Sequence, residues 1–246
     1  MTLMEEAVQT VLLSQEQSGK PLAVLLAGHH GSGKSTLWNG RLSDIIRIPL
    51  VNADRMMMSI LPEAFSSTGT TKPLPQWAAD IRDSDSSWMK VAQKGVEAFV
   101  AQAMAHKVPF AMETVFSYWD DAGGGIPKSK VDLIRELKRK GYYVLLLFVG
   151  LSNAQLSVAR VSTRVARGGH DVALDKLLCR FPRTQKAVGV ALTVANAAIL
   201  TDNSRTQKEA FTVCRIQSGN KKLFDCRDGE KPVPAAILEW LSVVCP

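Results

Sequence analysis

The chain has 246 residues, enough for one α/β domain with a full hydrophobic core. Hydrophobic residues make up 46% and charged residues 22%, an ordinary globular composition that excludes a disordered or fibrous chain. The formal charge of +7 favours anionic partners, either phosphorylated metabolites or nucleic acid. No apolar run is long enough to span a bilayer, and the acidic N-terminus lacks a signal core, so we expect a cytoplasmic protein without membrane contact.

Apolar periodicity predicts alternating helices and strands. Residues 4–17 have helical spacing, and residues 22–27 form the continuous apolar run that is typical of a strand buried on both faces of a parallel sheet. Further buried strands are expected at 48–52, 108–112, 142–149 and 194–200. Helices are expected at 35–43, 86–106, 130–140, 153–167 and 173–191. This alternation predicts an α/β fold, a doubly wound and mainly parallel sheet flanked by helices.

Two segments depart from the alternation. Residues 62–85 are rich in Ser, Thr, Pro and Asp, and predict a surface excursion near the substrate side. Towards the C-terminus, segments 211–216 and 222–226 flank a Ser-Gly-Asn turn and predict a β-hairpin, followed by a helix at 234–241. We therefore expect a single domain over 1–246, with a core at about 21–205 and a hairpin-plus-helix decoration over 206–246.

The four cysteines lack the spacing of a metal site. They are Cys179, Cys214, Cys226 and Cys245. We expect buried reduced thiols, with a Cys214–Cys226 disulfide as the alternative.

Between the first strand and its helix lies GHHGSGKS, which fits the P-loop pattern G-x-x-x-x-G-K-[ST]. Its glycines let backbone N–H groups surround phosphates, and the helix N-terminus adds partial positive charge. Lys34 can reach the β- and γ-phosphate oxygens, and Ser35 can ligate Mg²⁺. The sequence thus predicts a P-loop NTPase-type fold that binds ATP and Mg²⁺. The side chains of His29 and His30 are expected to be solvent-facing spacers in the loop. The loop residues expected to hold the nucleotide are Gly28, Gly31, Ser32, Gly33, Lys34, Ser35 and Thr36.

Two carboxylates follow expected strands. Asp54 comes after the second strand, where a kinase needs a group that orients an acceptor hydroxyl and takes its proton. An N-cap for a helix that starts at Arg55 is an equal alternative for Asp54, and both roles can hold. Glu113 directly follows the third strand, so it emerges at the carboxyl edge where α/β sheets bind ligands, with hydroxyls nearby on Thr114 and Ser117.

Arginines recur at helical spacing in the second half of the chain. Arg160, Arg164 and Arg167 share one helix face, which ends at a Gly-Gly-His sequence and is followed by Arg180 and Arg183. A solvated helix face is the alternative. The two-glycine stop favours a mobile lid that carries phosphate-binding arginines.

Five sequence blocks in this order resemble the zeta-toxin-like kinases, relatives of UDP-N-acetylglucosamine kinases that are often described as predicted ABC-type ATPases. The blocks are GHHGSGKST, VNAD, MET with a following serine, RVSTRVARGGHDV and TDNS, and together they cover about residues 21–205. The resemblance implies a small-molecule kinase that transfers the ATP γ-phosphate to a nucleotide sugar, the 3′-OH of UDP-N-acetylglucosamine, and a small protein antitoxin as partner. Nucleic acid is not an expected partner.

The resemblance also implies residue roles. ATP and Mg²⁺ bind at Lys34 and Ser35, with Asn203 of the last block on the nucleotide side, and Asp54 is the acceptor-side base. Glu113 and Thr114, with Ser117, line the acceptor pocket. Arg164 and Arg167 match best as the arginines that stabilise the transferring phosphoryl group, and Arg180 is a further candidate on the substrate side.

The sequence is also consistent with other function classes. The acceptor could instead be a nucleotide cofactor, a nucleic-acid end or an antibiotic, since the phosphate-handling residues would be the same. A non-catalytic nucleotide switch is a further alternative, although the chain has no N-K-x-D guanine-reading element and no LSGGQ-like signature. The chain departs from the family pattern in the 62–85 excursion, in the tail after residue 205, and in a threonine where the last motif often has tyrosine.

Overall fold

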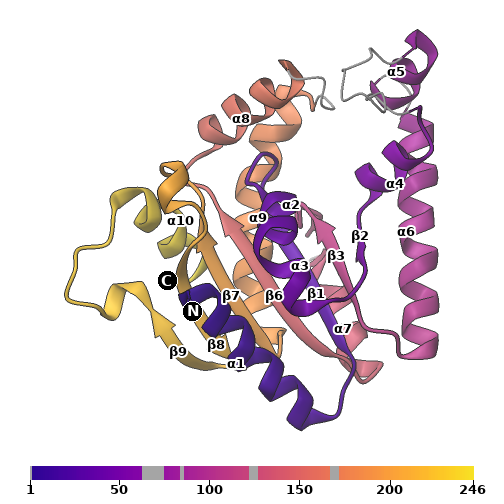
Figure 1. Cartoon of the computed structure of the whole chain (residues 1–246). Coiled ribbons are helices and arrows are strands. Elements are labelled where there is room, and N and C mark those ends of the chain that lie inside the picture. Colours follow the sequence, from indigo (N-terminus) through magenta and orange to yellow (C-terminus); the bar gives the residue numbers. More distant parts are fainter. Residues whose placement is uncertain (1, 63–74, 84–85, 122–126, 167–171) are drawn as a thin grey trace.

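A computed structural model describes residues 2–62, 75–83, 86–121, 127–166 and 172–246 (Figure 1). Within these ranges, seven strands form one sheet in the order β2-β3-β1-β6-β7-β8-β9, and β4 and β5 pair separately. The first five strands of the order are parallel, and β8 and β9 are antiparallel to their neighbours. This confirms the expected doubly wound, mainly parallel sheet. The strands are β1 (Leu22–Gly28), β2 (Leu50–Val51), β3 (Phe110–Thr114), β4 (Trp119–Asp120), β5 (Lys128–Ser129), β6 (Tyr143–Gly150), β7 (Ala197–Asp202), β8 (Thr212–Ser218) and β9 (Lys221–Asp225).

Helices cover both faces of the sheet (Figure 1). They are α1 (Leu3–Ser18), α2 (Lys34–Leu37), α3 (Ser43–Ile46), α4 (Ala53–Ser59), α5 (Gln76–Asp83), α6 (Ser86–His106), α7 (Val131–Arg139), α8 (Ala154–Ala166), α9 (Leu174–Val194) and α10 (Ala235–Val244). A π-helical turn at Trp38–Leu42 joins α2 to α3, so the helix expected after the P-loop continues to Ile46.

The two faces of β1 and β6 belong to two hydrophobic cores. Alternate residues such as Leu25 and Leu146 pack with α6, α7, α9 and α10, whereas Leu26 and Leu147 pack with α1 and the helical stretch after the P-loop. Every residue of β1, β6 and β7 is buried, which explains the continuous apolar runs of β1, of β6 and of the first four residues of β7.

The C-terminal segment forms the expected hairpin and helix. Strand β8 pairs with β7, and the fully buried Trp240 of α10 packs in the same core as the parallel strands. The Trp240 Nε1–H donates a hydrogen bond to Asp202 Oδ1 at 3.0 Å. The tail is therefore packed directly beneath the carboxyl end of β7.

Some expected boundaries differ from the structure. Strand β2 has two residues, where five were expected, and β3 begins at Phe110 because Lys107 has a left-handed φ of 59° and Pro109 has no N–H to pair. Part of the 62–85 excursion, residues 76–83, is the helix α5, and residues 63–74 lie outside the described ranges. All four cysteines are free thiols, so Cys214 and Cys226 are not bridged. In the described part of the chain, none of the helices has the length and apolar character to cross a membrane.

Candidate active site

The P-loop connects β1 to α2 at the carboxyl edge of the sheet (Figure 1). Gly31 and Gly33 have left-handed φ angles of 70° and 90°. A Cβ at Gly31 would lie 2.9 Å from Arg160 Cβ, and one at Gly33 would lie 2.7 Å from Asn203 Nδ2. Both glycines are thus required by backbone conformation and by the closeness of α8 and of the loop after β7.

Lys34 turns its side chain back into the loop. Its Nζ donates hydrogen bonds to the carbonyl oxygens of Gly28 at 3.1 Å and His29 at 2.9 Å. Burial lowers the pKa of Lys34 from its ordinary value, the negative charges of Glu113 and Asp54 oppose that shift, and the positive charge of Arg164 adds to it. Four side chains named from the sequence therefore share one electrostatic environment, in which an anionic phosphate would favour the charged form of the lysine.

The hydroxyl of Ser35 faces the carboxylate of Glu113. The Ser35 Oγ donates to the two Glu113 carboxylate oxygens at 3.0 and 2.8 Å, across 78 residues of sequence. The register brings them together, because β3 lies beside β1 with Glu113 opposite Leu26. A hydroxyl and a carboxylate are hard oxygen donors, so this pair fits Mg²⁺, which binds through a few protein oxygens and substrate phosphates. The structure thus adds Glu113 to the metal-binding candidate Ser35.

Asp54 is not the N-cap of its helix. Asn52 occupies that position, and its Oδ1 accepts from Asp54 N at 2.7 Å and from Arg55 N at 3.3 Å. The capping alternative for Asp54 is therefore wrong. Its side chain is exposed in the first turn of α4, on the same edge of the sheet as the P-loop.

The other acceptor-side candidates lie on the turn after β3. Thr114 Oγ1 accepts from Phe116 N at 3.2 Å, which supports the left-handed φ of 65° at the buried Phe116. Ser117 is half-buried on the same turn. Thr36 lies in the helix α2 that follows the P-loop.

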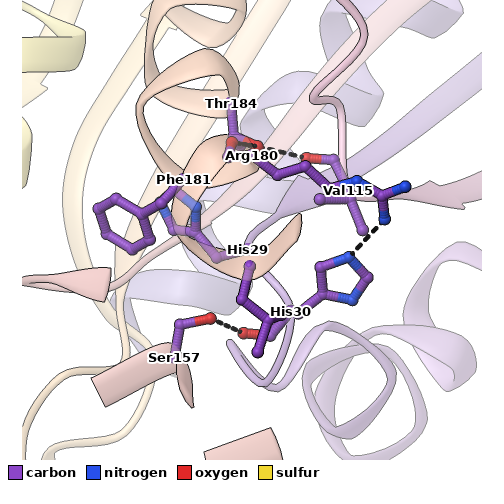
Figure 2. A pocket seen from close by; sticks show the side chains of 8 residues that line it. His29, His30, Val115, Ser157, Arg180, Phe181 and Thr184 are labelled. Carbon is purple, nitrogen blue, oxygen red and sulfur yellow. Dashed lines mark hydrogen bonds between the residues drawn. The ribbon is translucent and has the colours of Figure 1, made fainter. Parts of the chain in front are cut away.

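The arginines come from α8 and α9. Arg164 is close enough to Lys34 for its charge to act on the lysine, and Arg160 packs against Gly31. Arg180 Nη1 lies 3.1 Å from His30 Nε2 (Figure 2). Arg167 lies outside the described residues, so its predicted role stays a prediction.

The P-loop histidines are the residues that the sequence did not identify. His29 is 2% exposed, and neither of its ring nitrogens has a hydrogen-bond partner. Its ring stacks on Phe181 of α9, with centroids 3.8 Å apart and planes at 11° (Figure 2). Burial, with a smaller contribution from the charge of Lys34, lowers the pKa of His29 to about 3. The expectation of a solvent-facing spacer is wrong for His29, and His30 is half-buried.

Asn203 of the TDNS block holds the P-loop through a hydrogen bond to its main chain. Asn203 Nδ2 donates to the carbonyl oxygen of Ser32 at 2.8 Å. The preceding Asp202 is fully buried and accepts from Ser204 Oγ at 2.6 Å as well as from Trp240. Asn203 therefore contacts the nucleotide-binding loop itself.

A P-loop backed by a parallel sheet, with two carboxylates and an arginine from neighbouring elements around its lysine, defines a P-loop kinase. The model of the family described as Zeta toxin matches residues 6–191, so the chain belongs to the Zeta toxin family.

Individual relatives are more distant. An uncharacterized protein of Haemophilus influenzae (strain ATCC 51907 / DSM 11121 / KW20 / Rd) is 28% identical over 159 residues, which cover 65% of this chain and 91% of that protein.

Two solved structures share the fold. One is from the PezAT chromosomal toxin–antitoxin system of the human pathogen Streptococcus pneumoniae, with 13% identity, a TM-score of 0.52, and coverage of 99% of this chain and 88% of that chain. The other is the AvrRxo1-ORF1:AvrRxo1-ORF2 complex with sulphate ions, with 13% identity, a TM-score of 0.51, and coverage of 98% and 70%.

Proposed function

We propose that this protein transfers the γ-phosphate of ATP to the 3′-OH of UDP-N-acetylglucosamine. The observation that carries the kinase chemistry is the shared environment of Lys34, Asp54, Glu113 and Arg164 at the end of the P-loop. Family membership supports the choice of a nucleotide sugar as acceptor.

The P-loop holds the triphosphate. Backbone N–H groups of the loop and the start of α2 surround the phosphates, and Lys34 leaves the carbonyls of Gly28 and His29 to contact the β- and γ-oxygens. Asn203 keeps the loop in shape through its bond to Ser32. Ser35 and Glu113 would hold Mg²⁺, which when bound would supply positive charge against the negative charge of the triphosphate.

The acceptor binds on the side of β2 and β3, where Glu113, Thr114 and Ser117 line its pocket. The exposed Asp54 carboxylate orients the sugar hydroxyl and accepts its proton. The hydroxyl oxygen bonds to the γ-phosphorus while the bond from that phosphorus to the β,γ-bridging oxygen breaks, and ADP leaves. The guanidinium groups of Arg164, Arg167 and Arg180 stabilise the negative charge of the phosphoryl group in transfer.

We further propose a small protein antitoxin as partner. The similar structures from Streptococcus pneumoniae and of AvrRxo1-ORF1 are described as a toxin–antitoxin system and as a two-protein complex. An antitoxin that limits this activity would have to cover the nucleotide site or the acceptor pocket.

The test is transfer of label from γ-labelled ATP to a panel of UDP-sugars, nucleotide cofactors and water. We expect label on UDP-N-acetylglucosamine, and a loss of about 10²-fold or more in kcat for Asp54→Asn, because proton transfer by a positioned side chain contributes that much. The affinity for ATP should stay unchanged in this variant. The matched control is Asp44→Asn, which changes an exposed aspartate in the first turn of α3.

Label on another acceptor would support the proposed kinase activity and show that the acceptor is not UDP-N-acetylglucosamine. Label that is found only in free phosphate would instead indicate an ATPase or a nucleotide switch. Activity within a few-fold of the wild type in Lys34→Met would contradict the mechanism as a whole, because the lysine charge is expected to stabilise the transition state.

A further inference from the structure

Two adjacent P-loop residues contact two adjacent residues of α9. His29 stacks on Phe181, and His30 Nε2 lies 3.1 Å from Arg180 Nη1 (Figure 2). The main chain of the loop is also held at this point, since Ser157 Oγ of α8 donates to the carbonyl oxygen of His30 at 2.7 Å. The helix that carries Arg180 is thus attached to the P-loop through side chains.

In the contact between His30 and Arg180, the arginine is the donor and the histidine is the acceptor. A guanidinium has only donors, so the imidazole Nε2 must accept, and the ring proton lies on Nδ1. His30 therefore acts here as a neutral acceptor for Arg180.

The position of Lys34 shows where this contact lies relative to the phosphates. The Lys34 Nζ, the group that meets β- and γ-oxygens in a P-loop, lies 2.9 Å from the carbonyl oxygen of His29. His30 is the next residue of the loop. Arg180 is consequently held at the loop residue that follows the carbonyl contacted by Lys34.

A second contact fixes α9 close to Arg180. Thr184 lies one turn after Arg180, and its Oγ1 donates to the carbonyl oxygen of Val115 at 3.0 Å, in the segment that follows β3. The helix is thus joined to both the P-loop side and the acceptor side. What is left to order is the long Arg180 side chain, which has many rotamers when it is free in solvent.

We propose that His30 is a positioning residue, which accepts a hydrogen bond from Arg180 and holds its guanidinium at the γ-phosphate end of the P-loop. This inference rests on the proposed phosphotransfer for its effect on rate, but not for its effect on binding. A side chain fixed before the reaction loses less conformational freedom when it contacts the phosphoryl group, so it stabilises the transition state more.

The first measurement is nucleotide affinity, because it does not depend on turnover. The ratio of the Kd for ADP to the Kd for a non-hydrolysable ATP analogue reports contacts to the γ-phosphate. We expect Arg180→Ala to lower this ratio about tenfold, the effect of a charge-assisted hydrogen bond, and His30→Leu to lower it several-fold. His30→Gln should restore most of the loss, since its amide oxygen can accept from Arg180.

The second measurement is kcat for phosphate transfer. His30→Leu should lower kcat about tenfold with little change in the KM for ATP, and Arg180→Ala about 10²- to 10³-fold. The double variant should be no slower than Arg180→Ala, because His30 acts through the arginine. The matched control is His106→Leu, an exposed histidine at the end of α6. Thermal unfolding of every variant identifies any that fails to fold.

The outcomes separate the two proposals. An unchanged affinity ratio in His30→Leu, or effects of the two single variants that multiply in the double variant, would overturn the positioning role. If the affinity ratio falls as expected while the wild type transfers no phosphate to any acceptor, His30 positions Arg180 in a nucleotide-binding protein and the proposed enzymatic function is wrong.

Discussion

A neutral histidine lies buried within the phosphate-binding loop. The folded protein lowers the pKa of His29 from 6.5 to about 3, mainly through burial, while in the unfolded chain the ring takes up a proton below about pH 6.5. Between these values the unfolded state binds one more proton than the folded state. The contribution of His29 to the free energy of unfolding therefore falls as the pH falls, by at most about 1.4 kcal/mol per pH unit.

We predict that His29→Phe weakens this acid sensitivity. The phenyl ring keeps the stacking on Phe181 and removes two unpaired nitrogens. Urea unfolding at pH 7, 6, 5 and 4.5 should give a difference in stability between variant and wild type that grows in favour of the variant as the pH falls. A difference that does not change with pH would mean that His29 does not titrate as the structure indicates.

For individual residues, the sequence predicts the features that depend on neighbouring residues in the chain. The P-loop residues follow from an eight-residue pattern, and Asp54 and Glu113 follow from their places after apolar strands. The pair of Ser35 with Glu113 spans 78 residues and the pair of His30 with Arg180 spans 150, and neither has a signal in one sequence. The burial of His29 depends on the distant ring of Phe181, so nothing next to His29 could have indicated it.

Among the elements, the C-terminal hairpin is held by one buried carboxylate. Asp225 at the end of β9 accepts from Arg215 Nη1 at 2.8 Å and from Arg227 Nη2 at 2.8 Å. Burial alone would raise the pKa of Asp225, but hydrogen bonds from the two arginines outweigh it and lower the pKa to about 2. The ion pairs therefore fix the two strands and the turn that leads towards α10.

We predict that Asp225→Ala lowers the free energy of unfolding by about 2–4 kcal/mol, because it leaves two half-buried arginines without their partner. A depressed carboxylate pKa stabilises the fold above about pH 4, and this contribution is lost as the pH falls towards 2. The loss should thus be full at pH 7 and smaller near pH 3 in denaturant titrations. Asp228→Ala, an exposed neighbour that pairs with Lys222, is the control and should change stability by less than about 1 kcal/mol.

Element positions were predictable where burial is complete. Strands β1 and β6 lie within one residue of their apolar runs, since both faces are covered and the pattern has no polar interruption. The sequence predicts too long a strand for β2, because β2 is a half-buried edge strand of two residues, for which apolar content is a weak guide. The hairpin was predictable from its turn residues, whereas the contact of Trp240 with Asp202 is tertiary and was not.

In the whole molecule, the candidate site joins segments that are far apart in sequence. The P-loop follows β1, Glu113 ends β3, Asn203 follows β7, and the arginines come from α8 and α9. A nucleotide that contacts these parts binds only the folded chain, so it must stabilise the fold as a unit.

We predict that a non-hydrolysable ATP analogue with Mg²⁺, at about 100 times its Kd, adds about 2.7 kcal/mol to the free energy of unfolding and raises Tm by about 5–10 °C. Differential scanning fluorimetry measures this shift. Lys34→Met should remove most of it, and chelation of Mg²⁺ should reduce it. A wild-type Tm that does not respond to the analogue would show that the P-loop does not bind the nucleotide.

Strand β9 forms one edge of the sheet, and this position has a consequence for how the protein behaves at high concentration. An edge strand has unpaired N–H and C=O groups that can recruit a strand from another copy and begin aggregation. Lys221 and Lys222 are both exposed on β9. A second copy that docked edge to edge would bring like charges together, and long lysine side chains would have to lose their hydration. The two lysines thus protect solubility at the edge that the hairpin adds to the sheet.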